Sequence, residues 1–368
     1  MYSIKKNYLY LVPFTLFLLL GSCSKDFSPI IAPPNLKPTT GTWHFLGLED
    51  KYVVKLRLNR DYLYACAATK GLWRLNIIDD NEYWEHLGLV DTSSSNSSWY
   101  GVQDVAFDEQ NDNWLLVAFH PEKAEYHSVY RTFDGANSWN YADSSLLISI
   151  FHNGNWYYEY ARVNNLIENN NRILGIESGA YYTNDFGDTW HKLGNIGAPA
   201  KGIYDVKISP QNSNIIWIGG ESIYFEPVLS YSKNAGNSWI NIDLVGTVPT
   251  DNAVYSIAID PNNSNIVYLC MQGVIIKTTD GGKSWIVPLT THPQGAFFNA
   301  ILSHPTCSYR LYAAAGFDLL ETLDAGITWQ KVEHSLPDMT VVYKMIWGND
   351  YNTIYFGTTK GVYEFKIN

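Results

Sequence analysis

The sequence predicts an all-β fold, a seven-bladed β-propeller of four-stranded blades that is closed by an N-terminal strand completing the C-terminal blade. Three observations support it: an eight-residue turn motif that occurs five times, paired apolar segments between its copies, and a tryptophan that recurs at a blade-length interval. Aromatic residues make up 15% of the 368-residue chain, and aromatic side chains favour strands. The 46% hydrophobic content also excludes a disordered chain.

The turn motif reads Ser/Thr-x-Asp-x-Gly-x-Ser/Thr-Trp. Its Asp can accept backbone N–H groups that a hairpin turn leaves unpaired, its Gly allows positive φ, and its Trp opens the next strand and packs on the neighbouring blade. Two copies differ: Asn234 replaces Asp, and Ala136 replaces Gly, which predicts a looser or strained turn. The acceptor and tryptophan positions are Asp134, Asp185, Asn234, Asp280 and Asp324, with Trp139, Trp190, Trp239, Trp285 and Trp329.

These copies resemble the Asp-box, or BNR, repeat of propellers such as the sialidases, the sortilins and the photosystem II assembly factors. The repeat-bearing region spans most of the mature chain. The resemblance implies that the turns lie on the outer rim, away from the binding face. We interpret the aspartates as turn staples, because turn bonding alone explains their spacing. Calcium binding or acid catalysis is the alternative.

Between the copies, two apolar segments joined by a turn rich in Pro, Asn and Ser recur, and this pattern predicts a β-hairpin. With the hairpin around the turn motif, each unit has four strands, which is one propeller blade. The paired segments are 204–210 with 214–219, 254–261 with 265–270, 298–305 with 310–316, and 343–347 with 353–357.

The tryptophan that opens each fourth strand can be followed upstream to Trp84 and Trp43, and the seven tryptophans lie 41 to 55 residues apart. The chain finishes with a third strand at 361–368 and has a lone fourth strand at 41–48. We expect these two strands to pair, because pairing removes exposed sheet edges. Residues 144–156 include extra residues in the third blade, and six or eight blades are the alternatives.

The N-terminal segment resembles an export signal. Residues 1–23 combine two lysines, an apolar stretch too short to span a bilayer, and the ending Leu-Gly-Ser-Cys. This ending resembles the lipobox of bacterial lipoproteins, which implies lipidation of Cys23; an ordinary secretory signal is the alternative. Residues 24–41 form a Pro-rich tether, and residues 42–368 the propeller. We expect an exported monomer, anchored by lipid at the outer membrane or cell surface, with its orientation left open.

In propellers, the loops that enter the innermost strands and the loops that join the second and third strands form the default binding face. Aromatic rings beside acids on this face suit a glycan or a protein partner, while packing between blades is the alternative for each ring. The net charge of -11 argues against a nucleic-acid partner. The candidate face residues are Trp99, Tyr100, His120, Glu122, Glu177, Tyr204, Glu221, Tyr224, Tyr255, Phe298, Asp318 and Tyr343.

The function predicted from this face is non-catalytic binding of a glycan or protein, and the alternative is a glycoside hydrolase with paired carboxylates. Glu177, Glu221 and Asp318 could supply such a pair, but no local motif assigns catalytic residues. The sequence lacks the Arg-Ile-Pro-type motif of the sialidases, which disfavours that activity. We expect no cofactor and no metal, because no cofactor fingerprint occurs and His120 and His127 match no metal-ligand spacing.

Overall fold

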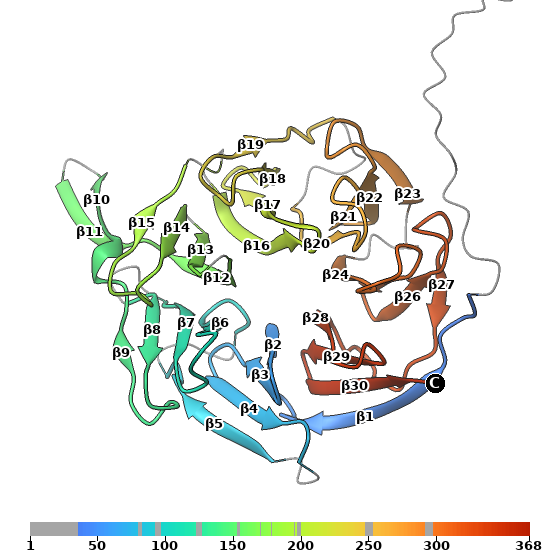
Figure 1. Cartoon of the computed structure of the whole chain (residues 1–368), viewed down its shortest axis with the longest axis horizontal. Helices are drawn as coiled ribbons and strands as arrows, with labels where there is room; N and C mark the ends of the chain where they lie inside the picture. The colour runs from blue at the N-terminus through green and yellow to red at the C-terminus, as the bar shows by residue number, and fades with distance from the viewer. Residues whose placement is uncertain are drawn as a thin grey trace, which may run out of the picture. The chain divides into compact units, whose positions relative to one another are not determined.

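The computed structural model describes residues 36–79, 83–92, 97–122, 127–152, 155–169, 171–177, 179–194, 196, 200–246, 253–290 and 297–368. Within these ranges the chain forms seven four-stranded antiparallel sheets, set as blades around a central axis (Figure 1). This arrangement confirms the predicted all-β propeller and its count of seven blades. No helix in the described part of the chain is long and apolar enough to cross a bilayer. The predicted signal segment 1–23, with Cys23, lies outside the described residues.

Each of blades 1 to 6 is a run of four consecutive strands that pair in chain order, with the first strand innermost. Blades 1 to 3 comprise β2 (Lys55–Asn59), β3 (Tyr62–Cys66), β4 (Leu72–Asn76) and β5 (Trp84–Gly88); β6 (Gly101–Phe107), β7 (Leu115–His120), β8 (Val129–Thr132) and β9 (Asn140–Tyr141); and β12 (Val163–Glu168), β13 (Ile173–Glu177), β14 (Ala180–Thr183) and β15 (His191–Lys192). Blades 4 to 6 comprise β16 (Ala200–Ser209), β17 (Asn212–Ser222), β18 (Pro227–Ser232) and β19 (Ile240–Asn241); β20 (Ser256–Ile259), β21 (Val267–Met271), β22 (Val274–Thr278) and β23 (Ile286–Thr290); and β24 (Phe298–Ser303), β25 (Leu311–Ala315), β26 (Asp318–Thr322) and β27 (Gln330–Val332).

Blade 7 joins the two ends of the folded chain. It consists of β28 (Val342–Trp347), β29 (Thr353–Thr358), β30 (Gly361–Ile367) and, as its outermost strand, β1 (Gly41–Gly47). β1 runs antiparallel to β30, and Trp43 lies opposite Phe365. The Trp43 ring stacks on Phe365 at a centroid distance of 4.7 Å and contacts Phe356 at 4.8 Å. The predicted closure of the ring by the N-terminal strand is therefore confirmed.

The extra residues of the third repeat form a separate hairpin. A 3-10 turn, η1 (Ser144–Leu146), leads into β10 (Leu147–His152), which pairs with β11 (Asn155–Tyr160) in a two-stranded sheet. The hairpin projects outward from the ring (Figure 1). The backbone N–H of Ala161 donates to the Leu146 carbonyl at 3.0 Å, so the insertion leaves and re-enters the ring at one point.

The five turn motifs connect the third and fourth strands of blades 2 to 6. In blade 2, Asp134 Oδ1 accepts hydrogen bonds from Thr132 Oγ1 (2.6 Å) and from the Ser138 N–H (2.9 Å), and Oδ2 accepts one from Ser138 Oγ (2.6 Å). These bonds lower the pKa of Asp134 to about 2. Asn234 keeps the same acceptor bonds and donates from Nδ2 to Ser238 Oγ at 2.9 Å. Ala136 adopts a left-handed φ of 76°, which is a strained conformation for a residue with a Cβ.

The tryptophans of the fourth strands link successive blades. The indole N–H groups of Trp84, Trp139 and Trp190 each donate to a backbone carbonyl in or beside the fourth strand of the preceding blade, at 2.7 to 2.8 Å. For Trp84, that carbonyl belongs to Leu46 in β1, so the same contact also spans the point of closure. Large rings buried between twisted sheets supply much of the apolar contact that holds neighbouring blades together.

Candidate ligand-binding site

A cavity of about 570 Å³ opens at the end of the ring where the innermost strands begin. It collects side chains from several blades around the central axis. Eight of the predicted face residues line it: Trp99, Tyr100, His120, Glu122, Glu177, Tyr204, Tyr255 and Tyr343. Side chains that lie more than 100 residues apart in the sequence therefore share one site.

Aromatic rings form one wall of this cavity. Trp99 meets Tyr204 edge-on, with ring centroids 5.9 Å apart, and Tyr204 lies parallel to Tyr255 at 5.8 Å with an interplanar angle of 3°. Trp99 is 58% exposed although it stands beside these rings. An indole left this open in an aromatic cluster offers a flat apolar face to a ligand.

Buried polar atoms without a partner face the same cavity. Glu177 Oε2, His120 Nδ1 and Asn164 Oδ1 are buried and accept or donate no hydrogen bond among the described residues, and all three residues line the cavity. Buried polar groups in proteins are nearly always hydrogen-bonded, so three unpaired atoms at one cavity indicate groups that a ligand or solvent satisfies.

The environment keeps Glu177 and His120 largely uncharged at neutral pH. Burial raises the pKa of Glu177 to about 8, although the nearby positive charge of Arg162 opposes the shift. Burial, together with Arg162, lowers the pKa of His120 to about 4. A protonated carboxyl group and a neutral imidazole can both exchange hydrogen bonds with hydroxyl, amide or amine groups of a ligand.

Glu221 lies outside the cavity and bonds one ring of its aromatic wall. The Tyr204 hydroxyl donates to Glu221 Oε2 at 2.8 Å, and burial and this hydrogen bond raise the pKa of the tyrosine. Glu221 is buried and does not line the cavity itself. Its role in the structure is to hold the Tyr204 ring in place.

Besides Glu221, three predicted face residues lie outside the cavity. Tyr224 is exposed on the β17–β18 loop, and Asp318 pairs with Lys331 at 2.6 Å. Placing Phe298 on the face was wrong, because its side chain is fully buried in β24. The preceding residue, Phe297, is 43% exposed and contacts Tyr255 at 5.6 Å. Side chains alternate along a strand, so an error of one residue moved the prediction from the face to the core.

Several cavity residues were not predicted from the sequence. They are the polar residues Gln103, Arg162, Asn164 and Asn299, which lie in or beside innermost strands. Arg162 directly precedes β12, and the other three lie within the first three residues of their strands, but the sequence does not show which of them face the axis. Only the closed ring brings them to a common cavity.

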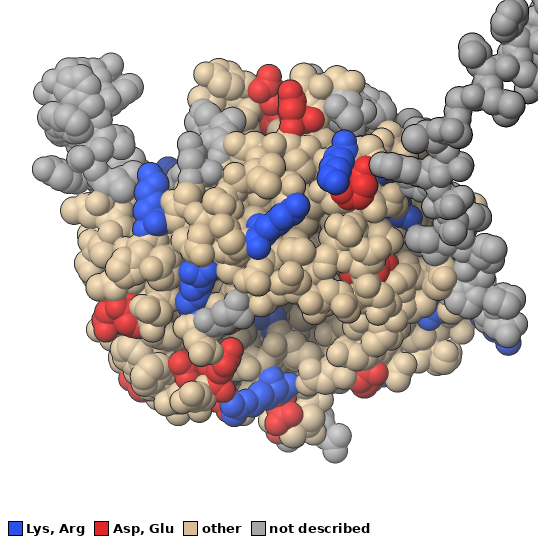
Figure 2. All heavy atoms as spheres, turned by 45° about the horizontal axis from the view of Figure 1, so that its top comes forward, with Lys and Arg blue, Asp and Glu red and all other residues tan. Residues whose placement is uncertain are grey.

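Exposed apolar side chains also lie on loops that join second and third strands, at the same end of the blades as the cavity. On the β17–β18 loop, Ile223, Tyr224 and Phe225 are all exposed, as is Phe317 in the β25–β26 turn. Charged residues are scattered in small groups over the face viewed in Figure 2, and other residues make up most of it. Exposed apolar side chains on such loops are available for contact with a partner.

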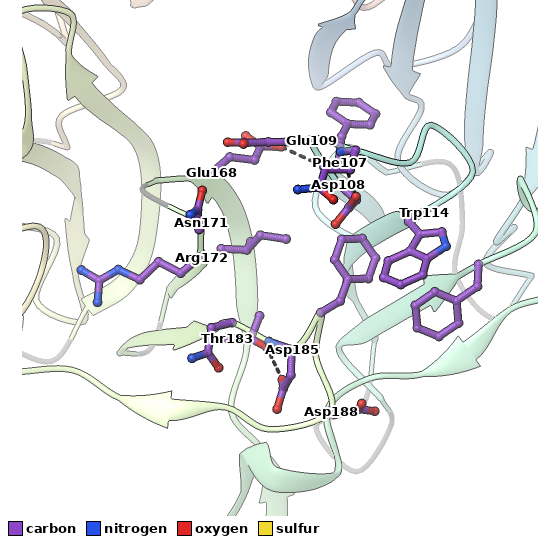
Figure 3. A pocket seen from close by; sticks show the side chains of 15 residues that line it. Phe107, Asp108, Glu109, Trp114, Glu168, Asn171, Arg172, Thr183, Asp185 and Asp188 are labelled. Atoms are coloured by element: carbon purple, nitrogen blue, oxygen red, sulfur yellow. Dashed lines mark hydrogen bonds between the residues drawn. The ribbon is translucent and has the colours of Figure 1, made fainter.

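A second cavity, of about 300 Å³, lies between blades 2 and 3 (Figure 3). It is lined by Trp114, Phe133 and Phe186 and by acidic residues that already have partners. Asp185 accepts a hydrogen bond from Thr183 Oγ1 at 2.7 Å, and Glu168 accepts one from the Phe107 N–H at 2.9 Å. Among the predicted site residues, only the turn residue Asp185 lines this cavity, so it belongs to the packing of the two blades.

The fold and the central cavity define the class: a seven-bladed propeller with an aromatic, partly polar site on its axis. No family model and no curated protein matches the chain. Among solved structures, a YCF48 bound to a D1 peptide is similar, at 17% identity and a TM-score of 0.64 over 91% of this chain and 97% of that one. YCF48 from Cyanidioschyzon merolae is similar at 13% identity and a TM-score of 0.62, over 88% of this chain and 98% of that one. An ancestral GH74 enzyme is similar at 13% identity and a TM-score of 0.60, over 87% of this chain and 45% of the enzyme's chain.

These similarities concern the fold alone. At 13 to 17% identity they show that the chain shares the propeller architecture with a peptide-binding protein and with an enzyme. Because one architecture carries many functions, the residues of the central cavity have to decide between them.

Proposed function

We propose that this protein is a binding propeller whose central cavity takes a segment of a protein partner. The observation that carries the proposal is the open aromatic wall of the cavity, together with exposed apolar side chains on loops at the same end of the blades. A protein segment can fill the cavity while its flanks cover Tyr224, Phe225 and Phe317. Buried aromatic anchors surrounded by such contacts are typical of protein interfaces.

The unpaired polar atoms support the same ligand class. A peptide brings amide N–H groups and side-chain donors, which can reach His120 Nδ1 and Asn164 Oδ1. The bound D1 peptide of the similar YCF48 structure shows that a propeller of this architecture can hold such a segment.

A selection from a displayed random-peptide library tests the proposal. We expect the wild-type protein to enrich related sequences, and Tyr255→Ala to weaken binding of the enriched peptide at least tenfold, because it removes one ring of the wall. Tyr351→Ala is the matched control, since Tyr351 is an exposed tyrosine in the β28–β29 turn at the opposite end of the blade. Failure to enrich any peptide, or equal losses in both variants, would contradict the proposal.

A glycoside hydrolase is the second candidate, and Glu177 is the observation that favours it. A buried carboxyl group with a pKa of about 8 is protonated at neutral pH, as a general acid must be, and Glu122 supplies a second carboxylate in the same cavity. A hydrolysis screen over plant and bacterial polysaccharides separates the two functions. Product release that Glu177→Gln abolishes would replace the binding proposal.

We also propose that the propeller is exported and anchored by a lipid on Cys23, as the signal-like sequence 1–23 suggests. Mass spectrometry of the membrane-extracted protein tests this. We expect a diacylglyceryl modification on Cys23 and its loss, together with release from the membrane fraction, in Cys23→Ser. An unmodified Cys23 in the membrane fraction would contradict it.

A further inference from the structure

The channel beneath the aromatic cavity contains a cluster of charges, in which Lys55, Lys344 and two aspartates are buried and the Arg57 and Lys207 side chains are 25% and 29% exposed. Four cationic side chains line a space of about 210 Å³: Lys55 and Arg57 from β2, Lys207 from β16 and Lys344 from β28. Lys55 also lines the aromatic cavity, so the two spaces are adjacent along the axis. These strands are the innermost strands of blades 1, 4 and 7, and blade 4 is not a neighbour of either of the others. Their side chains therefore meet only across the channel.

Two carboxylates, those of Asp104 and Asp205, form the ion pairs of all four cationic side chains. Asp104 receives two hydrogen bonds from Arg57, at 2.7 and 2.8 Å, and lies 3.3 Å from Lys55 Nζ. Asp205 lies 2.8 Å from Lys344 Nζ and 3.7 Å from Lys207 Nζ. The longest of these contacts belongs to Lys207, which shares its carboxylate with a closer lysine.

The other innermost strands balance this charge only in part. β20 and β24 contain no charged residue. Glu168 at the end of β12 lines the cavity between blades 2 and 3, where the Phe107 N–H donates to it, and burial raises the pKa of its carboxyl group against the opposing positive charge of Arg57. Even with Glu168 counted, four cations face three carboxylates. The two cysteines that contact the cluster, Cys66 and Cys270, are buried with raised thiol pKa values and stay neutral. The channel thus holds an excess of positive charge in a protein whose net charge is -11.

An unbalanced charge away from solvent is costly, and it is resolved either by loss of a proton or by a counter-ion. We propose that the channel binds a small oxyanion, of the size of sulfate, phosphate or an acetate-like carboxylate, between Lys207, Lys344, Lys55 and Arg57. The space is large enough for such an ion, and four donors converge on it from three blades. Charge-assisted hydrogen bonds from lysine and arginine are the usual means of holding oxyanions.

The site is linked to the protonation of Lys207. Burial and the positive charges of Lys344 and Lys55 lower the pKa of this lysine to about 7, against the opposing attraction of Asp205. Loss of this proton therefore reduces the excess charge when no anion is bound. An anion favours the protonated lysine. Binding therefore takes up protons near pH 7 and weakens as the pH rises above 7, while Asp104 and Asp205 remain ionised throughout, since their nearby cations hold both pKa values below the usual range.

Isothermal titration with sodium sulfate at constant ionic strength tests the proposal, because sulfate itself does not titrate in this range. For the wild-type protein we expect a saturable isotherm with one site, affinity at least threefold higher at pH 6.5 than at pH 8.5, and a heat that changes with the ionisation enthalpy of the buffer. Repeating the titration with phosphate and acetate identifies the preferred anion.

Lys207→Met should abolish sulfate binding, whereas Lys207→Arg should retain it and lose most of the pH dependence. Lys233→Met, which removes an exposed lysine outside the channel, is the matched control for net charge. Tyr255→Ala should leave sulfate binding unchanged, so that failure of this site and failure of the peptide site are distinguishable. A non-saturable response, or the same response in wild type and Lys207→Met, would overturn the proposal. If Lys207→Met does not fold, the comparison of wild type with Lys207→Arg across pH decides it.

Discussion

At the scale of single residues, the same few hydrogen bonds recur in every turn motif. The acceptor side chain ties the end of the third strand to the start of the fourth, in the aspartate copies and in the Asn234 copy alike. The Asn234 copy shows that the geometry of the acceptor matters more than its charge. The aspartates are accordingly turn staples in this structure, with each carboxylate occupied by donors of its own turn.

Replacement of Asp280 tests this staple. Asp280 Oδ1 accepts from the Lys283 and Ser284 N–H groups, each at 2.9 Å, and Oδ2 from Ser284 Oγ at 2.6 Å. We expect Asp280→Ala to reduce the free energy of unfolding by about 2 kcal/mol, because several backbone donors lose their acceptor. Asp280→Asn should cost less than about 1 kcal/mol. Urea denaturation measures both, and equal losses would contradict the role of geometry.

The buried carboxyl group of Glu177 should leave a signature in the pH dependence of stability. Its pKa is raised from 4.5 to about 8 in the folded state, so the folded protein binds more protons than the unfolded chain between these values. Stability contributed by this group is therefore lost as the pH rises. The free energy of unfolding of Glu177→Gln, relative to that of the wild type, should therefore increase by up to about 1.4 kcal/mol per pH unit across this range.

Urea denaturation of both proteins at pH 5 and pH 8 provides the measurement. Glu122→Gln is the control, because Glu122 lines the same cavity but is exposed. A constant difference between Glu177→Gln and the wild type at both pH values would show that the carboxyl group is not desolvated.

At the scale of elements, the ring accommodates an inserted hairpin whose strands belong to none of the seven blades. The hairpin of β10 and β11 forms its own two-stranded sheet, and its two ends meet where Ala161 donates to Leu146. Leu146 and Ala161 are buried in the core shared by blades 2 and 3, so the ring is complete on either side of the hairpin. A hairpin of this kind adds surface to the protein but contributes no strand to a blade.

Excision of residues 147–160 should therefore leave the propeller folded. We expect replacement of this hairpin by a two-residue Asn-Gly turn to change the melting temperature by no more than about 3 °C, because the loop ends are already in contact. Calorimetry measures the change. As a comparison, excision of β14 and β15, which are integral to blade 3, should prevent folding; a similar loss for the hairpin would show that it supports the ring.

At the scale of the whole molecule, one short strand decides whether the ring is closed. β1 covers the edge of β30 through six paired positions, and Trp43 packs on Phe365 and Phe356. Because every blade rests on two neighbours, loss of this strand exposes a sheet edge and loosens blades 1 and 7 together. Upstream of β1, Thr39 also hydrogen-bonds Glu321 and Tyr312 in blade 6, which fixes the entry of the tether.

Trp43→Ala should weaken this closure by about 3 kcal/mol, the usual cost of truncating a packed large aromatic residue. We expect a lower melting temperature and faster proteolysis within blades 1 and 7. Trp114→Ala is the control, since Trp114 is also partly buried but packs on Phe133 and Phe186 between blades 2 and 3, away from the point of closure. If Trp114→Ala has the larger effect, closure by β1 is not the weak point of the ring.

The sequence by itself determined the repeat, the four strands of each blade, the number of blades and the pairing of β1 with β30. These features follow from local patterns: a turn motif whose donors and acceptors lie within seven residues, strands that alternate, and a tryptophan at each interval. The site was predicted only in part. Loop positions identified Trp99, Tyr204 and Tyr255, but the side of the strand on which Phe297 and Phe298 face depends on a bulge in β24 that the sequence does not show.

Only the tertiary structure decided what meets on the axis. Arg162, Asn164 and the lysines of the channel come from innermost strands of different blades, and their separation in the sequence contains no information about their distance across the ring. Whether each charge is paired, shared or in excess depends on which partners the closed ring brings within a few ångströms. The raised pKa of Glu177 and the excess charge around Lys207 are therefore properties of the assembled propeller.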